Sequence, residues 1–111
     1  MKGNKFEVIA YGSILTDNSM EMPQRLKLLY DVYHMQINEG CICDTISNYA
    51  DQFGHIHVAD APGRHEPGTG EINYTKVIRH LEACGYTGRV GYELFPETDT
   101  KTAVAAIMQH C

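Results

Sequence analysis

The sequence lacks any apolar run close to the roughly 20 residues that a membrane-spanning helix requires, so no membrane partner is expected. It also lacks a basic cluster: its nine Lys and Arg residues are scattered, and the net charge is −5. Nucleic-acid surfaces concentrate Lys and Arg, so no nucleic-acid partner is expected either. Glu7 interrupts the first short apolar run and no small-residue cleavage site follows it, so we expect no signal peptide and a cytoplasmic location.

The spacing of the cysteines does not suggest a disulfide framework. The four cysteines are Cys41, Cys43, Cys84 and Cys111. The first two are separated by one residue, whereas redox and zinc motifs have a two-residue spacer, and no second pair complements them. Reduced cysteines in a cytoplasmic protein are therefore expected.

The composition is that of an ordinary soluble globular domain. The 111 residues are 43% hydrophobic and 21% charged, which is enough for one domain with a modest core. Residues 1–24 carry few regular signals beyond a candidate strand at 6–11, and Pro23 discourages a helix. We treat residues 1–24 as a poorly assignable segment and residues 25–111 as the folded part.

Regular patterns alternate between strand and helix from residue 25 onward. Strands are predicted at 25–33, 55–59 and 89–95, a connecting loop at 35–43, and an irregular loop rich in Gly and Pro at 60–72. A helix capped by Asp44 or Thr45 and ended by Gly54 follows the first strand, and a second helix runs from the cap Asn73 to Gly85. The expected apolar stripes of these helices are Ile46, Tyr49, Ala50 and Phe53, then Val77, Ile78, Leu81 and Cys84.

A third helix is predicted to begin at about Asp99, with Ala103, Val104 and Ile107 facing inward. The order strand, helix, strand, helix, strand, helix predicts an α/β fold with parallel strands and right-handed crossovers.

Polar side chains occur at the carboxyl end of each predicted strand. Asp31 and His34 end the first, His55 and His57 lie in the second, and Glu93 lies in the third. In parallel sheets these ends meet at one edge, where active sites are built. Each residue also has a plain structural interpretation: a polar strand end for Asp31 and Glu93, and a satisfied core histidine for His57. An aspartate or glutamate in an apolar run is costly to bury unpaired, which favours a ligand role for both.

The segments YDVYHMQ, GHIHVADAPGRHEPGTGEINY and GYTGRVGYELFP together resemble the C-terminal part of hydroxypyruvate isomerases, within the TIM-barrel sugar isomerase and epimerase superfamily. The resemblance covers about residue 28 to the end. It implies a partial (β/α)8 TIM barrel that holds the last three βα units. A part-barrel leaves open sheet edges, so a homo-oligomer or a complementing chain is expected as partner.

The resemblance also implies a divalent metal site, for Mg²⁺ or Mn²⁺, with Asp31, His57 and Glu93 as ligands. The family's fourth ligand is a glutamate in a Glu-Pro-x-Asn type motif that residues 1–24 lack, so weakened affinity is expected. By the same resemblance Glu93 is one of two catalytic carboxylates. His34 and Arg64 would bind the substrate, with His65 and Glu66 as further candidates in the loop.

The implied reaction interconverts hydroxypyruvate and tartronate semialdehyde through a metal-stabilised enediolate. His34 past a strand end and Arg64 in a loop are equally compatible with solvated side chains. His55 is interpreted as structural, Gly68-x-Gly70 as a tight turn, and Glu39, Glu71 and Glu97 as surface charges. Three alternatives stay open: a small-molecule hydroxy or oxo acid isomerase, a ketose 3-epimerase, and a catalytically incomplete fragment or paralogue acting as an assembly or binding module.

Overall fold

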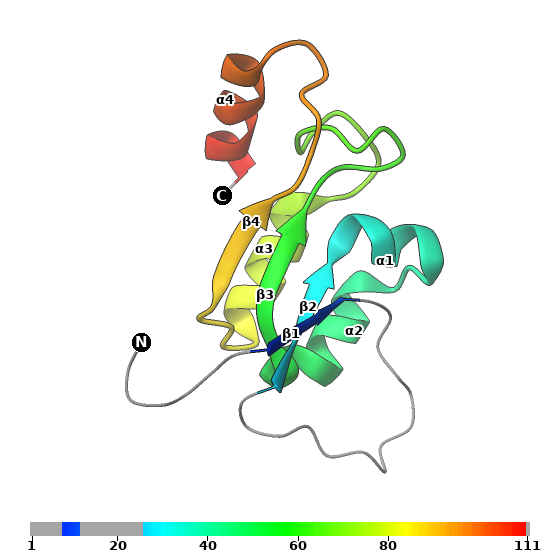
Figure 1. Ribbon diagram of the computed structural model, residues 1–111, viewed down its shortest axis with the longest axis vertical. Helices are drawn as coiled ribbons and strands as arrows, with labels where there is room; N and C mark the ends of the chain where they lie inside the picture. The colour runs from blue at the N-terminus through cyan, green and yellow to red at the C-terminus, as the bar shows by residue number, and fades with distance from the viewer. Residues whose placement is uncertain (1–7, 12–25, 111) are drawn as a thin grey trace.

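Four parallel strands form the centre of the molecule (Figure 1). The computed structural model describes residues 8–11 and 26–110. The strands are β1 (Val8–Tyr11), β2 (Leu26–Asp31), β3 (Phe53–Val58) and β4 (Arg89–Tyr92), and they neighbour one another in chain order. The partial parallel α/β barrel fold is therefore confirmed, and β1 lies within the candidate strand at 6–11, ahead of the three predicted βα units.

Helices lie between β2 and β3, between β3 and β4, and after β4 (Figure 1). They are α1 (Val32–Asn38), α2 (Ile42–Tyr49), the 3-10 turn η1 (Ala50–Gln52), α3 (Tyr74–Ala83) and α4 (Thr100–His110). In Figure 1 α2 and α3 lie behind the strands, whereas α4 lies beyond their carboxyl ends. No helix of the described part of the chain is long and apolar enough to cross a bilayer.

The core lies between the sheet and the helices, as the alternation along β3 requires. Ile56 and Val58 are buried, whereas His55 and His57 on the opposite face are half-buried. Tyr30 stacks on Phe53, with ring centroids 4.6 Å apart. These residues belong to a cluster completed by Val32, Met35, Ile42, Ile46, Ala50, Tyr74, Val77 and Leu81.

Helix α3 forms as predicted, since both of its ends carry the expected signals. The Asn73 side chain accepts a hydrogen bond from the Lys76 amide at 3.1 Å, which caps the first turn. Gly85 follows the helix with φ of +80°, a left-handed conformation that glycine adopts without strain. Cys84 is exposed, so the predicted apolar stripe is wrong at that position.

The predicted loop at 35–43 is wrong, because the end of α1 and the start of α2 together occupy most of it. Asp31 ends β2 and its carboxylate accepts from the His34 amide, so the chain passes from strand to helix without a linker. Gly40 and Cys41 both have positive φ, 65° and 49°, and this reversal joins α1 to α2 within a few residues. Helix α2 consequently begins at Ile42, before the predicted caps at 44 and 45.

Two boundaries and the packing of one residue also differ from prediction. Phe53 and Gly54 belong to β3 rather than to the preceding helix. Strand β4 ends at Tyr92, because the following residues bond to the loop after β3 instead of to a neighbouring strand. Val104 in α4 is 51% exposed, whereas Ala103 is buried as predicted.

Candidate metal centre

The strand register brings the predicted ligands together at the carboxyl edge of the sheet. Asp31 of β2 pairs with His57 of β3, and His57 pairs with Gly91 of β4. Glu93 lies two residues beyond Gly91, just past the end of β4. One ligand atom from each of Asp31, His57 and Glu93 can be chosen so that all lie within 4.8 Å of one another.

His57 is the central member of this cluster. Its Nδ1 lies 2.7 Å from Glu93 Oε2 and 3.6 Å from Asp31 Oδ2. The contact with Asp31 is too long for a hydrogen bond and the contact with Glu93 lacks hydrogen-bond geometry, so within the described residues Nδ1 is a buried polar atom without a hydrogen-bond partner. A buried nitrogen that faces two carboxylates in this way fits a metal-ligating histidine better than a core histidine whose ring nitrogens are both hydrogen-bonded.

A glycine on the neighbouring strand makes room for the histidine rings. A Cβ at Gly91 would lie 2.9 Å from His55 Nε2 and 3.3 Å from His57 Cδ2, which is too close for either ring to stay in place. His55 packs edge-on against His57 with centroids 4.9 Å apart. His55 therefore packs against the ring of the proposed ligand His57, and its structural or supporting role stays a prediction.

Asp31 has two separate tasks, one for each carboxylate oxygen. Oδ1 accepts from the His34 amide at 3.0 Å and caps α1, while Oδ2 faces His57. The side chain is almost fully buried, and this burial raises the pKa of the carboxyl above its ordinary value. The His34 amide and His57 partly offset that rise. A buried carboxylate of this kind gains from a bound cation.

Glu93 is half-exposed, so the expectation that its apolar neighbours bury it is wrong. Its side chain retains 50% of its accessible surface, because β4 ends before it and no further strand of the described chain covers it. Glu93 Oε1 lies 3.2 Å from Arg64 Nη2, and Oε2 faces His57. The Glu93 carboxylate thus lies between the Arg64 guanidinium and the His57 imidazole at the rim of the site.

Arg64 lies within the cluster rather than in solvent. Its Nη2 also donates to His34 Nε2 at 3.4 Å, and because guanidinium has no acceptor, His34 must accept there as a neutral ring. Burial and the Arg64 charge both lower the pKa of His34, which agrees with that state. The guanidinium lies over the rings of Tyr33 and Phe95, 5.2 and 5.8 Å from their centroids.

The other two loop candidates have structural contacts. His65 Nδ1 lies 2.7 Å from the Phe95 carbonyl, and Glu66 is buried and accepts from the Glu97 amide at 2.9 Å. Glu39, Glu71 and Glu97 are exposed, as predicted.

Sequence reasoning missed Asp60, which is 1% exposed and organises the whole 60–72 loop. Its carboxylate accepts from the amides of Ala61, Gly68, Gly70 and Ile72 at 2.9 to 3.0 Å. The interpretation of Gly68-x-Gly70 as a plain turn was incomplete, because both amides bind this carboxylate. An aspartate followed by a glycine-rich loop was the available signal.

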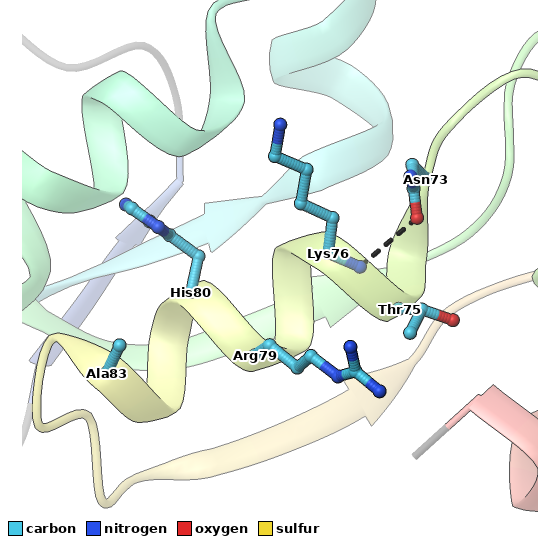
Figure 2. A pocket seen from close by; sticks show the side chains of 6 residues that line it. All are labelled: Asn73, Thr75, Lys76, Arg79, His80 and Ala83. Atoms are coloured by element: carbon cyan, nitrogen blue, oxygen red, sulfur yellow. Dashed lines mark hydrogen bonds between the residues drawn. The ribbon is translucent and has the colours of Figure 1, made fainter.

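A shallow hollow on helix α3 is separate from this cluster. Figure 2 shows that it is lined by Asn73, Thr75, Lys76, Arg79, His80 and Ala83. The Lys76 and Arg79 side chains extend in different directions, so their charges do not converge on a common point.

The donor set fits a divalent cation. Two carboxylates and one imidazole converge from three adjacent strands, and carboxylate oxygens suit Mg²⁺ and Mn²⁺. A parallel sheet with acidic and imidazole side chains at its carboxyl edge is the arrangement typical of (β/α)-barrel proteins. Residues 18–110 match the family described as xylose isomerase-like TIM barrel, and the chain belongs to that family.

The curated relatives that the chain resembles are named hydroxypyruvate isomerase and 2-oxo-tetronate isomerase. Over 79 residues the chain is 47% identical to hydroxypyruvate isomerase of Escherichia coli strain K12, covering 71% of this chain and 31% of that protein. It is 32% identical to 2-oxo-tetronate isomerase of Pectobacterium atrosepticum, covering 91% and 38%. The chain thus spans about a third of the length of the relatives it matches.

Solved structures agree with the fold. A structure titled AP endonuclease, family 2, from Brucella melitensis superposes with a TM-score of 0.73 at 35% identity, covering 77% of this chain and 33% of that one. The apo 3-keto-D-glucoside 4-epimerase from E. coli superposes with a TM-score of 0.70 at 27% identity, covering 78% and 34%.

Proposed function

We propose that this chain carries the metal-binding and acid–base part of an isomerase site that converts hydroxypyruvate to tartronate semialdehyde. The observation that carries the proposal is the convergence of Asp31, His57 and Glu93 within 4.8 Å at the edge of the sheet. The names of the relatives supply the substrate class, a short 2-oxo acid.

Asp31, His57 and Glu93 would hold the cation, and the imidazole nitrogen favours Mn²⁺ over Mg²⁺. When bound, such an ion stabilises the charge that develops on two neighbouring substrate oxygens. Burial of Asp31 keeps water away from one side of the site, whereas the exposed side of Glu93 leaves an approach for substrate.

Glu93 is the residue proposed to move the proton between adjacent substrate carbons. Its carboxylate stands at the open rim and is held by Arg64 on one oxygen and His57 on the other, which orients it without burying it. Enediolate chemistry in this family uses a second carboxylate. The described residues of β1, Val8–Tyr11, have no acidic side chain, so that strand does not supply it.

Arg64 and His34 are proposed to bind the carboxylate end of the substrate. The planar guanidinium suits a carboxylate because it donates two parallel hydrogen bonds. The rings of Tyr33 and Phe95 hold its plane, and the contact with His34 Nε2 steers one Nη group. Substrate would then share Arg64 with Glu93, which places the reacting carbons next to the proton-transfer group.

Assembly is part of the proposal, because β1 and β4 each lack a second neighbouring strand among the described residues. A second copy or a complementing chain would cover these edges and supply the second carboxylate. If neither a second copy nor a complementing chain binds, the chain is an incomplete barrel that retains the proposed metal ligands but does not catalyse the reaction. A ketose 3-epimerase is the second candidate function, since an imidazole ligand at His57 and proton transfer beside a carbonyl serve both reactions.

Turnover of hydroxypyruvate by the purified chain, with and without Mn²⁺ or Mg²⁺, tests the proposal when the oligomeric mass is measured on the same sample. Metal-dependent turnover that Glu93→Gln lowers at least about 1,000-fold is expected, because the amide cannot accept the proton. Glu82→Gln, at an exposed position of α3, is the matched control and should leave turnover unchanged. Unchanged turnover in Glu93→Gln would remove Glu93 from its role.

A further inference from the structure

We propose that Asp60 is a positioning residue, which sets Arg64 against Glu93 through the loop that it organises. This inference rests on the proposed function and adds to it a residue that touches neither cation nor substrate. It follows from the hydrogen bonds that join the carboxylate to the loop and the loop to the end of β4.

The Asp60 carboxylate is saturated by backbone amides. Oδ1 accepts from Ala61 at 2.9 Å and Ile72 at 3.0 Å, and Oδ2 accepts from Gly68 and Gly70, both at 2.9 Å. These four donors come from both ends of a 13-residue irregular loop, so one side chain closes it. A Cβ at Gly70 would collide with the Ala61 carbonyl oxygen and approach Asp60 Oδ1 to 2.6 Å, which explains the glycine.

The backbone of Asp60 closes a tighter turn around Arg64. The Arg64 amide donates to the Asp60 carbonyl at 2.9 Å, and the Asp60 amide donates to the His65 carbonyl at 2.7 Å. Within this turn Arg64 has φ of +63°, a left-handed conformation that costs energy for a residue other than glycine. The surrounding hydrogen bonds therefore hold Arg64 in a backbone conformation that is unfavourable for it without them.

The same turn is bonded to the segment that carries Glu93. The Phe95 amide donates to the Arg64 carbonyl at 2.9 Å, and His65 Nδ1 lies 2.7 Å from the Phe95 carbonyl. The Glu97 amide donates to Glu66 Oε1 at 2.9 Å. Asp60, the turn and the end of β4 thus form one connected frame, at the centre of which Arg64 Nη2 meets Glu93 Oε1.

Only an ionised carboxylate can fill this role. It accepts on both oxygens, whereas an asparagine offers one oxygen and one amide donor. In Asp60→Asn the carbonyl oxygen satisfies one pair of amides and the new NH₂ group confronts the other pair. The variant keeps the size of the side chain, so its effect is confined to the loop frame.

The test measures hydroxypyruvate kinetics and backbone amide exchange in Asp60→Asn, alone and combined with Arg64→Ala. We expect faster exchange at Gly68 and Gly70 and a KM at least about 10-fold higher in the otherwise unchanged protein. In the Arg64→Ala background the added change in KM should be under about 2-fold, because the positioned group is already gone. Asp99→Asn, which makes the same substitution at an exposed helix cap that accepts from the Thr102 amide, is the control expected to leave KM unchanged.

An equal fold-change in both backgrounds would overturn the proposal, since a general structural defect acts regardless of Arg64. An unchanged KM with disturbed glycine amides would overturn it as well. If the wild-type chain does not turn over hydroxypyruvate, the proposed function fails separately. The side-chain NMR signals of Arg64 then decide the positioning role, which requires them to shift in Asp60→Asn and to stay in place in Asp99→Asn. If Asp60→Asn does not fold, Gly70→Ala disturbs the same frame and is judged by the same criteria.

Discussion

Replacing Asp31 with asparagine should separate cation binding from stability. Asparagine retains an oxygen that accepts from the His34 amide, now 3.0 Å from Oδ1, and it is an equally good helix cap. What it removes is the negative charge beside His57. Among the proposed ligands this position is the most buried, so solvent screens the lost charge least.

The expected loss of cation affinity follows from Coulomb's law. A unit charge and a divalent cation 4 Å apart interact by about 8 kcal/mol at an effective dielectric constant of about 20, twice the value for two unit charges. The asparagine oxygen recovers more than half of that energy, so we expect a net loss of about 3 kcal/mol, which is about 100-fold weaker binding of Mn²⁺.

The free energy of unfolding, in contrast to the cation affinity, should rise or stay the same in Asp31→Asn. Because burial raises the pKa of Asp31, the folded state binds its proton more readily than the unfolded state does. The stabilising contribution of the protonated form is complete below the ordinary pKa of 3.8 and is lost as the pH rises through the folded pKa. At neutral pH the charged Asp31 therefore opposes folding, and Asp31→Asn removes that cost.

Calorimetric titration with Mn²⁺ and thermal unfolding in metal-free buffer at pH 7 measure the two effects on one sample. Asp44→Asn, at an exposed position in the first turn of α2, is the matched control for charge and should leave Mn²⁺ affinity unchanged. Unchanged Mn²⁺ affinity in folded Asp31→Asn would refute the assignment of Asp31 as a ligand. A large drop in melting temperature would refute the reasoning about burial.

Two further changes test the substrate end and the scaffold. Arg64→Lys keeps the charge but loses the planar guanidinium and its contacts with the Tyr33 and Phe95 rings. In steady-state kinetics the KM for hydroxypyruvate should therefore rise about 10-fold or more, with a smaller change in kcat. A KM within about 2-fold of the wild type would contradict the binding role. Asn73→Ala removes the cap on the Lys76 amide and should cost about 1 kcal/mol of stability, as measured by denaturant unfolding. No loss would show that water replaces the cap.

Local signals in the sequence predicted most of the scaffold. The alternation of polar and apolar residues in 55–59 placed His55 and His57 opposite Ile56 and Val58, as β3 shows. Asn73 and Gly85 marked the ends of α3 correctly. These predictions held because capping and strand alternation depend on neighbouring residues alone.

The predicted parallel topology was enough to expect that Asp31, His57 and Glu93 lie close together. The detailed geometry of the site could not be predicted in this way. The sequence does not show that α1 follows Asp31 directly, that Glu93 stays half-exposed, or that Arg64 lies against it. Each depends on which backbone lies beside the loop after β3. The four amides gathered by Asp60 are likewise distant from it along the chain except for Ala61. The sequence by itself determined the parallel α/β scaffold and the chemical types at its carboxyl edge. Only the tertiary structure decided how those groups meet, because close approach between segments is set by the packing of the whole chain rather than by local preference.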